Sequence, residues 1–237
     1  MCFSQTPALS PTGDCRPFSA DADGTMLGEG IGMVALRRLE DAERDGDRIY
    51  AVIRGVGSAS DGKSGSIYAP ESRGQALAIR RAYDMAGYDV DQVELIEAHG
   101  TATKAGDAAE FGGLRYAFED KLDEDNKQWC ALGSVKSQIG HTKSAAGSAS
   151  LFKVVMSLHH KVLPPTIKVS EPNPALNIEE SAFYLNTETR PWVHDPKTTR
   201  KGSVSSFGFG GSNFHVALEE YNGDTGQRGR YHASPLE

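Results

Sequence analysis

The segment at positions 144–158, SAAGSASLFKVVMSL, restricts the fold most, because as a helix it is small or apolar on nearly every face. A helix on the surface of a globular protein keeps a polar face toward water. A helix that is apolar all round belongs in the interior, with a neighbour on each side. We therefore expect a helix from about 144 to 160 at the centre of a layered fold.

The rest of the chain alternates between strand patterns and helix patterns. Apolar periodicity predicts strands at 31–39, 49–57, 93–98, 130–135, 202–207 and 213–220. It predicts helices at 72–86 and 107–118, and a short helix or turn in the charged segment EDAERDGDR. Such alternation is typical of an α/β layered fold with a largely buried sheet.

Composition excludes several classes of protein. The net charge is −7 without a basic stripe, so we expect no nucleic-acid partner. No run of eighteen apolar residues is present, so we expect no membrane span. The three cysteines (Cys2, Cys15 and Cys130) are widely spaced and odd in number, which favours unpaired thiols in a reducing compartment, the cytoplasm.

Three clusters of chemically capable residues each follow a predicted strand. His99 lies in EAHGTATKAGD, Lys136 and His141 lie in SVKSQIGHT, and Phe209 lies between glycines in SFGFGGSN. Sites in α/β proteins gather in the loops beyond strand ends. We therefore expect the three loops to converge.

The chemistry of such a convergence follows from the state of the histidines. His141 precedes the apolar helix, and the helix N-terminus, burial and the charge of Lys136 would all keep its imidazole neutral at pH 7. A neutral histidine donates from one ring nitrogen and accepts at the other. Two neutral histidines aimed at one oxygen would stabilise an enolate, and the GFGG turn could add a backbone N–H to a second oxyanion hole.

Blander interpretations stand beside this one. A lone histidine after a strand is more often structural, and His215, in a strand pattern, favours that interpretation. A zinc site of His99, Asp107 and His141 is an alternative, although no HxxxH or CxxC spacing supports it. GEGIG at 28–32 precedes its predicted strand, so a dinucleotide site is a weak interpretation.

Taken together, the three clusters resemble those of the β-ketoacyl synthases, the ketosynthase domains of fatty-acid and polyketide synthases. Two further segments, SPTGDCRPFSADADGTMLGEG and LPPTIKVSEPNP, match the family in the same order. The residues of these motifs are most similar to those of synthases of polyunsaturated fatty acids. The resemblance covers residues 1–221, and we interpret 222–237 as a linker. It implies a thiolase-like αβαβα sandwich, a homodimer, and decarboxylative Claisen condensation of malonyl-carrier protein with an acyl thioester.

The resemblance also implies roles for individual residues. His99 and His141 would hold the malonyl thioester oxygen, and Lys136 would orient them. Glu110 resembles the buried acidic partner of the family, and Phe209 the gating residue of the oxyanion hole. Further residues would support these groups: Thr101, Thr103, Asp107, Gly208 and Gly210. No metal or free cofactor is implied, because the substrates ride on the phosphopantetheine of an acyl carrier protein.

One departure from the family matters most: no cysteine lies in a nucleophile motif. The chain therefore resembles the C-terminal half of a ketosynthase without the part that carries the nucleophile, and we expect it to lack condensation activity alone. The alternative is a non-catalytic partner similar to a chain-length factor. A half-sandwich would leave sheet edges and helix faces uncovered, which predicts oligomers or poor solubility. A smaller departure is Ala102, where the family usually has glycine.

Overall fold

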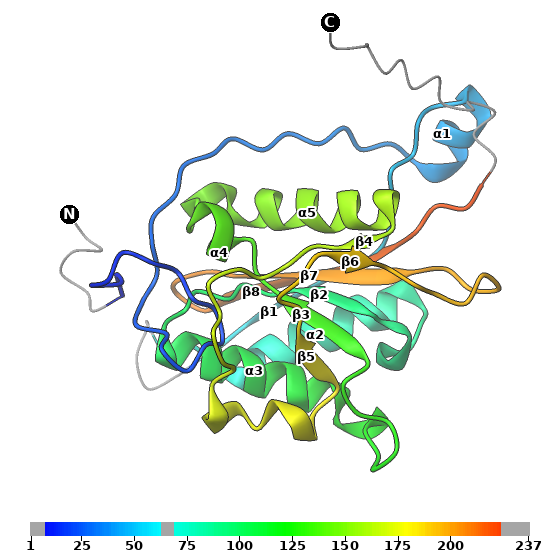
Figure 1. The fold of residues 1–237 in the computed structure, drawn as a ribbon. Helices are drawn as coiled ribbons and strands as arrows, with labels where there is room; N and C mark the ends of the chain where they lie inside the picture. Colours follow the sequence, from blue (N-terminus) through cyan, green and yellow to red (C-terminus); the bar gives the residue numbers. More distant parts are fainter. Residues whose placement is uncertain (1–7, 63–68, 224–237) are drawn as a thin grey trace, which may run out of the picture.

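A six-stranded mixed sheet forms the centre of the protein in a computed structural model that describes residues 8–62 and 69–223 (Figure 1). The strand order is β1-β8-β7-β2-β3-β5. The strands are β1 (Val52–Ser60), β8 (Ser212–Glu219), β7 (Lys201–Phe207), β2 (Leu95–Glu97), β3 (Cys130–Gly133) and β5 (Phe183–Leu185). A small second sheet pairs β4 (Val162–Leu163) with β6 (Arg190–Pro191).

Strand direction decides where the loops emerge. β7, β2, β3 and β5 are parallel neighbours, whereas β8 is antiparallel to both β7 and β1. The carboxyl ends of parallel strands lie at one edge of a sheet. The loops after β2, β3 and β7, which carry the three sequence clusters, therefore leave the sheet at the same edge.

Helices cover both faces of the sheet. α2 (Ser72–Ala86) and α3 (Lys104–Phe118) lie on one face, and α5 (Ala146–His160) lies on the other (Figure 1). Further α-helices are α1 (Leu39–Asp45) and the single turn α4 (Lys136–Ile139). Short 3₁₀ turns complete the description: η2 (Val90–Gln92), η3 (Glu119–Lys121), η4 (Lys143–Ala145), η5 (Pro174–Leu176) and η6 (Ile178–Glu180).

Local sequence explains where the main helices begin and end. The Glu71 side chain accepts from the N–H of Arg73 at the start of α2, and Gly87 ends that helix in the left-handed conformation. The Thr103 hydroxyl accepts from the N–H of Gly106 and so caps α3. The predicted helix at 72–86 is therefore confirmed, and α3 begins three residues before the predicted 107.

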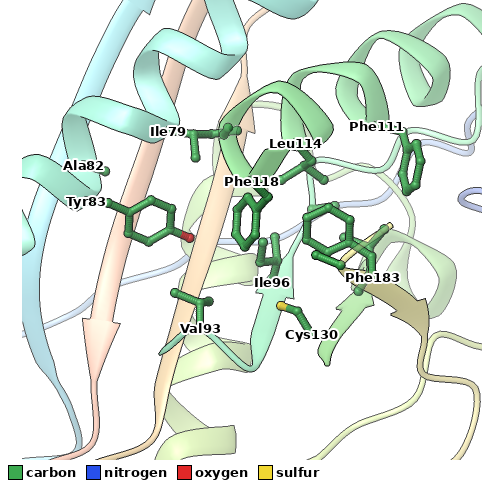
Figure 2. Close-up of a cluster of buried hydrophobic side chains, with 14 of the residues drawn as sticks. Ile79, Ala82, Tyr83, Val93, Ile96, Phe111, Leu114, Phe118, Cys130 and Phe183 are labelled. Carbon is green, nitrogen blue, oxygen red and sulfur yellow. The ribbon is translucent and has the colours of Figure 1, made fainter. Parts of the chain in front are cut away.

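Two apolar cores lie on the two faces of the sheet. The larger one packs α2 and α3 onto the strands, and Figure 2 shows Phe118 of α3 between Tyr83 of α2 and Phe183 of β5. The rings of Phe118 and Phe183 meet edge to face, with centroids 4.9 Å apart. The smaller core packs α5 onto β2, β3, β7 and β8 through Val154, Leu158 and Trp192.

The predicted strand at 31–39 is wrong. The segment at 31–38 is not a strand but an extended stretch that runs over α5 to α1 (Figure 1). Ile31 and Met33 are 94% and 92% exposed, and no strand among the described residues pairs with this segment. α5 (Ala146–His160) is the helix predicted at 144–160. It buries only its sheet-facing side, and Phe152 on its other side is 62% exposed, which is the uncovered helix face expected of a half-sandwich.

None of the helices in 8–62 and 69–223 combines the length and apolarity that crossing a bilayer requires. Cys2 and residues 224–237, which make up most of the predicted linker, lie outside the described residues.

Candidate active site

His99 follows β2 by two residues and is held by its backbone. The carboxylate of Glu110 on α3 accepts from the N–H of His99 at 2.7 Å and from the N–H of Gly100 at 2.7 Å. A carboxylate that accepts with both oxygens fixes the direction in which the loop leaves the strand. Burial raises the pKa of Glu110 to about 7, while these two N–H groups and the Lys136 ammonium act in the opposite direction.

Asp107 holds the same loop one turn earlier on α3. Its oxygens accept from the N–H of Phe18 at 2.7 Å and from the N–H of Ala102 at 3.0 Å, and burial raises its pKa to about 7. The hydroxyls of Thr101 and Thr103 lie 2.9 Å apart beside it. Thus Asp107, Thr101 and Thr103 shape the loop around His99 through its backbone.

Lys136 begins α4 at the end of β3 and is almost completely buried. Within the part of the chain that the structure describes, its Nζ has no hydrogen-bond partner. Burial lowers the pKa of Lys136, and the carboxylates of Glu97 and Glu110 partly oppose that effect. Burying an ammonium without a hydrogen-bond partner lowers the stability of the fold. The presence of such a group therefore points to a functional role for Lys136.

His141 is fixed on both sides of its backbone by the N-terminal segment. Its N–H donates to the carbonyl of Met26 at 2.6 Å, and its carbonyl accepts from the N–H of Gly28 at 3.0 Å. Gly28 has no room for a Cβ, because the carbonyl oxygen of Ile139 occupies that space. The Nδ1 of His141 accepts from the N–H of Lys143 at 3.0 Å, so a neutral His141 carries its proton on Nε2.

The structure brings the two histidine rings together. Their centroids are 5.2 Å apart, with the planes at 85°. Burial, followed by the charge of Lys136, lowers the pKa of His99 well below its usual range and that of His141 to about 4. Both imidazoles are therefore neutral at pH 7 and both residues are partly exposed, so a substrate oxygen can reach them.

The β7–β8 hairpin borders this pair of histidines. The ring of Phe207 at the end of β7 lies 6.0 Å from that of His99, whereas Phe209 at the tip is 61% exposed. The N–H of Gly208 donates to the carbonyl of Ser212 at 2.7 Å, and Gly210 has a φ of 132° that its missing side chain permits. Gly208 and Gly210 thus give the hairpin its tight tip.

Sequence reasoning missed several groups at the site. Phe207 escaped notice because an aromatic residue at the end of a strand gives no functional signal. Glu97, the first letter of EAHGTATKAGD, and Lys153, in the middle of the apolar helix, form a buried ion pair of 2.7 Å. A lysine inside an apolar helix was the available signal for that pair.

Cys15, Cys130 and His215 supply no reacting group to this arrangement, although Sγ of Cys15 donates to the carbonyl of Thr101 in the His99 loop at 3.7 Å. Burial raises the pKa of Cys15 and raises that of Cys130 well above its usual range, so neither is an activated thiolate. His215 lies in the core, where its ring nitrogens contact the hydroxyls of Ser205 and Tyr83. Its contacts support the structural interpretation of this residue.

The geometry gives the zinc alternative no support. Both carboxylate oxygens of Asp107 already accept backbone N–H groups. Among residues 8–62 and 69–223, no group of three or more histidine, cysteine, aspartate or glutamate side chains is arranged to hold a metal ion.

Sequence comparison assigns the chain to a family. The sequence model of the β-ketoacyl synthase C-terminal domain matches residues 50–170, and that of the N-terminal domain matches residues 1–42. A protein of the polyunsaturated fatty acid synthase of Thraustochytrium sp. is 48% identical over 224 residues, which are 93% of this chain and 8% of that protein. The polyketide synthase PksL of Bacillus subtilis is 43% identical over 93% of this chain and 5% of that protein.

Solved structures give the same family and the fold. A ketosynthase from module 6 of the bacillaene synthase of Bacillus subtilis superposes with a TM-score of 0.88 at 43% identity. The match covers 93% of this chain and 39% of that one, so this chain spans less than half of the solved domain. The sheet with helices on both faces is therefore thiolase-like, as the motifs predicted. The chain belongs to the β-ketoacyl synthase family.

Proposed function

We propose that this chain is the part of a carrier-protein-dependent condensing enzyme that decarboxylates malonyl thioesters. In that step the bond between the malonyl carboxylate and C2 breaks, carbon dioxide leaves, and the electron pair passes into an enolate whose negative charge lies on the thioester oxygen. His99 and His141 would donate hydrogen bonds to that oxygen. The enolate then attacks an acyl thioester in condensation, or takes a proton from water in decarboxylation alone.

The observation that carries this proposal is the pair of neutral imidazoles with ring centroids 5.2 Å apart. His141 supports it further, because its Nδ1 accepts from Lys143 and leaves Nε2–H as the donor. Neutral donors that are fixed before the charge develops stabilise a transition state without a cost of reorganisation.

Lys136 would keep both histidines neutral. Its buried charge lowers the pKa of each imidazole, so neither ring picks up a proton as the enolate forms nearby. Glu110 and Asp107 would hold the loop around His99 at the distance that this requires, together with Thr101 and Thr103. We propose no metal and no free cofactor in this step.

The hairpin would serve the condensation half of the reaction. Phe209 would act as a gate at the tip, and its backbone N–H would add to an oxyanion hole, with Gly208 and Gly210 shaping the turn. A strand end and a tight turn fix this position more firmly than a long loop would.

The substrates and partners follow from the family. We propose an acyl carrier protein that presents malonyl and acyl groups on phosphopantetheine, a homodimer, and a product in the polyunsaturated fatty acid or polyketide class. Condensation would need a nucleophilic cysteine from the remainder of the ketosynthase domain, because Cys15 and Cys130 are buried thiols of raised pKa. The non-catalytic alternative fits the two neutral histidines and the lysine less well.

The test is release of carbon dioxide from a malonyl phosphopantetheine thioester by the purified chain. We expect turnover by the unaltered chain and a loss of about 100-fold in His99→Ala and in His141→Ala, the usual effect of removing an oxyanion donor. His160→Ala is the matched control, since His160 lies exposed at the end of α5. It should retain full activity.

Absence of turnover in a folded, unaltered chain would refute the decarboxylation proposal and favour the non-catalytic alternative. Formation of a β-ketoacyl product by the isolated chain would show that a nucleophile is present after all.

A further inference from the structure

Beneath the two histidines lies a buried ion pair that the proposed mechanism does not use. The Nζ of Lys153 on α5 is 2.7 Å from Oε2 of Glu97, the last residue of β2. The Glu97 side chain is fully buried and that of Lys153 is 8% exposed. Glu97 precedes His99 by only two residues, so its carboxylate lies at the start of the loop that carries His99.

The other oxygen of Glu97 contacts the second loop of the site. Its Oε1 accepts from the N–H of Val135 at 2.5 Å and from the hydroxyl of Ser150 at 3.5 Å. Val135 is the residue before Lys136, and Ser150 lies one turn of α5 before Lys153. One carboxylate therefore joins the strand that leads to His99, the turn that carries Lys136, and the helix that follows His141.

Stability alone gives a weak reason for this pair. Removing two charges from water costs nearly as much as their attraction returns, so apolar residues would serve a core equally well. The space beside the pair is limited as well. A Cβ at Gly133 would lie 2.7 Å from Oγ1 of Thr166 and would collide with it, whereas Nζ of Lys153, 3.5 Å away, would be at ordinary contact distance.

The charge of Glu97 also acts on Lys136. The Glu97 carboxylate raises the pKa of Lys136 against the effect of burial and so helps to keep that ammonium charged. Lys153 competes with Lys136 for the same carboxylate, and it holds Oε2 at 2.7 Å. Without Lys153, the attraction between Glu97 and Lys136 would lose this competitor and would draw the two groups together.

We infer that Glu97 and Lys153 are positioning residues, which set the place of Lys136 and of the loop of His99 relative to each other. Lys153 anchors one oxygen of the carboxylate so that the other oxygen holds the turn at Val135. Neither residue touches the substrate. The inference rests on the proposed function for its kinetic consequence, but its structural consequence can be measured without turnover.

The test compares Lys153→Met with Tyr83→Phe in the full chain. Lys153→Met keeps the length of the side chain and removes the charge, so Glu97 loses its anchor. Tyr83→Phe is the control, because it removes a buried hydroxyl that contacts Ser203 and His215 on the opposite face of the sheet. Both variants lose a buried polar contact, but only the first one affects the proposed positioning device.

Two quantities separate the interpretations. For Lys153→Met we expect kcat for decarboxylation to fall about tenfold to 100-fold with KM changed less than about twofold, because a misplacement of about 1 Å can cost about 100-fold. We also expect the ring resonances of His99 and His141, measured by NMR on histidine-labelled protein, to shift. Tyr83→Phe should lower the melting temperature and leave kcat and both sets of resonances unchanged.

A Lys153→Met variant that melts earlier but keeps kcat and both sets of histidine resonances would overturn the inference, because the pair would then be only structural. If Lys153→Met does not fold, the double variant Glu97→Gln/Lys153→Met removes both charges and is expected to give the same shifts. If the unaltered chain does not turn over, the proposed function fails, and the histidine resonances of the variant still decide the positioning role.

Discussion

The loops around the two histidines are polar and are bonded into the fold, whereas the apolar segment at 31–38 is exposed. In the site, Glu110 alone accepts two backbone N–H groups of the His99 loop, and the backbone of His141 bonds to both Met26 and Gly28. In the segment, Ile31 and Met33 are almost fully exposed. Composition alone therefore does not decide whether a segment is buried. Burial depends on whether another part of the chain packs against that segment.

Strand pairing explains why only one of two apolar patterns in this chain becomes a strand. The alternating pattern at 202–207 becomes β7 because β2 and β8 pair with it on its two sides. The more apolar pattern at 31–38 has no neighbouring strand among the described residues and stays extended over α5 (Figure 1). A β-strand forms only where a second segment pairs with it. The apolar pattern of one segment alone is therefore not sufficient to predict a strand.

The largest expected effect separates the two regions by stability. Glu110→Ala leaves the buried N–H groups of His99 and Gly100 without acceptors, which should lower the free energy of unfolding by about 3 kcal/mol or more. Met33→Ser in the exposed segment should change it by less than about 0.5 kcal/mol. Urea denaturation at pH 7 measures both.

Glu110→Gln is the matched control, since its single amide oxygen can satisfy one of the two donors. It should give an intermediate loss. Equal losses in Glu110→Ala and Met33→Ser would mean that the exposed segment is packed in solution, and the comparison between the regions would fail.

The next effect concerns association. Exposed apolar side chains on the segment and on α5 favour contact between copies. The triple variant Ile31→Ser/Met33→Ser/Leu36→Ser should raise the dissociation constant of the oligomer at least about tenfold, because each apolar side chain buried in a contact contributes about 1.5 kcal/mol or more. Analytical ultracentrifugation across a concentration series measures this change. A monomeric unaltered chain with a sharp two-state melt would contradict the expectation.

Much of the site was predictable because it depends on strand ends. The predicted strands at 93–98 and 130–135 contain β2 and β3, and the parallel pairing of these strands brings His99 and His141 to one edge. The helix at 72–86 was predictable to the residue, because a left-handed Gly87 ends it. Local signals and a common edge were sufficient for these parts.

The remainder depends on contacts between segments far apart in the chain. Nothing near Phe18 or Met26 in the sequence indicates that their backbones hold Asp107 and His141, because those partners lie 89 residues and more away. The pairing of Glu97 with Lys153 is hidden for the same reason. The prediction of a strand at 31–39 was wrong because apolar periodicity does not show whether a second strand is available to pair with the segment.

A smaller effect appears in the pH dependence of stability. Burial lowers the pKa of His215 to about 3, below the value of about 6.5 in the unfolded chain. The stability that neutral His215 contributes is therefore full above pH 6.5 and is lost as the pH falls from there toward 3. Asp107 and Glu110 act in the opposite direction, since their raised pKa makes the folded state retain protons.

Comparison with His215→Gln isolates the histidine from these carboxyl groups. The unaltered chain should lose about 1.5 kcal/mol more stability than the variant between pH 6.5 and 5, the amount that linkage gives for one such group. Urea denaturation at the two pH values checks this difference. Parallel pH profiles of the two proteins would mean that the pKa of His215 is the same in the folded and the unfolded chain.

The smallest expected effect compares two left-handed residues near the histidines. Ala102 (φ 61°) is fully buried against Cys15 and Ala22, and Lys143 (φ 57°) is exposed. Ala102→Gly and Lys143→Gly each relieve about 1 kcal/mol of backbone strain and give back a similar amount of entropy in the unfolded chain. Only Ala102→Gly also loses a buried methyl, worth about 0.8 kcal/mol. In thermal denaturation, Lys143→Gly should therefore have a higher melting temperature than Ala102→Gly, because only position 102 loses a buried side chain. The reverse order would mean that the relief of backbone strain at position 102 outweighs the loss of packing there.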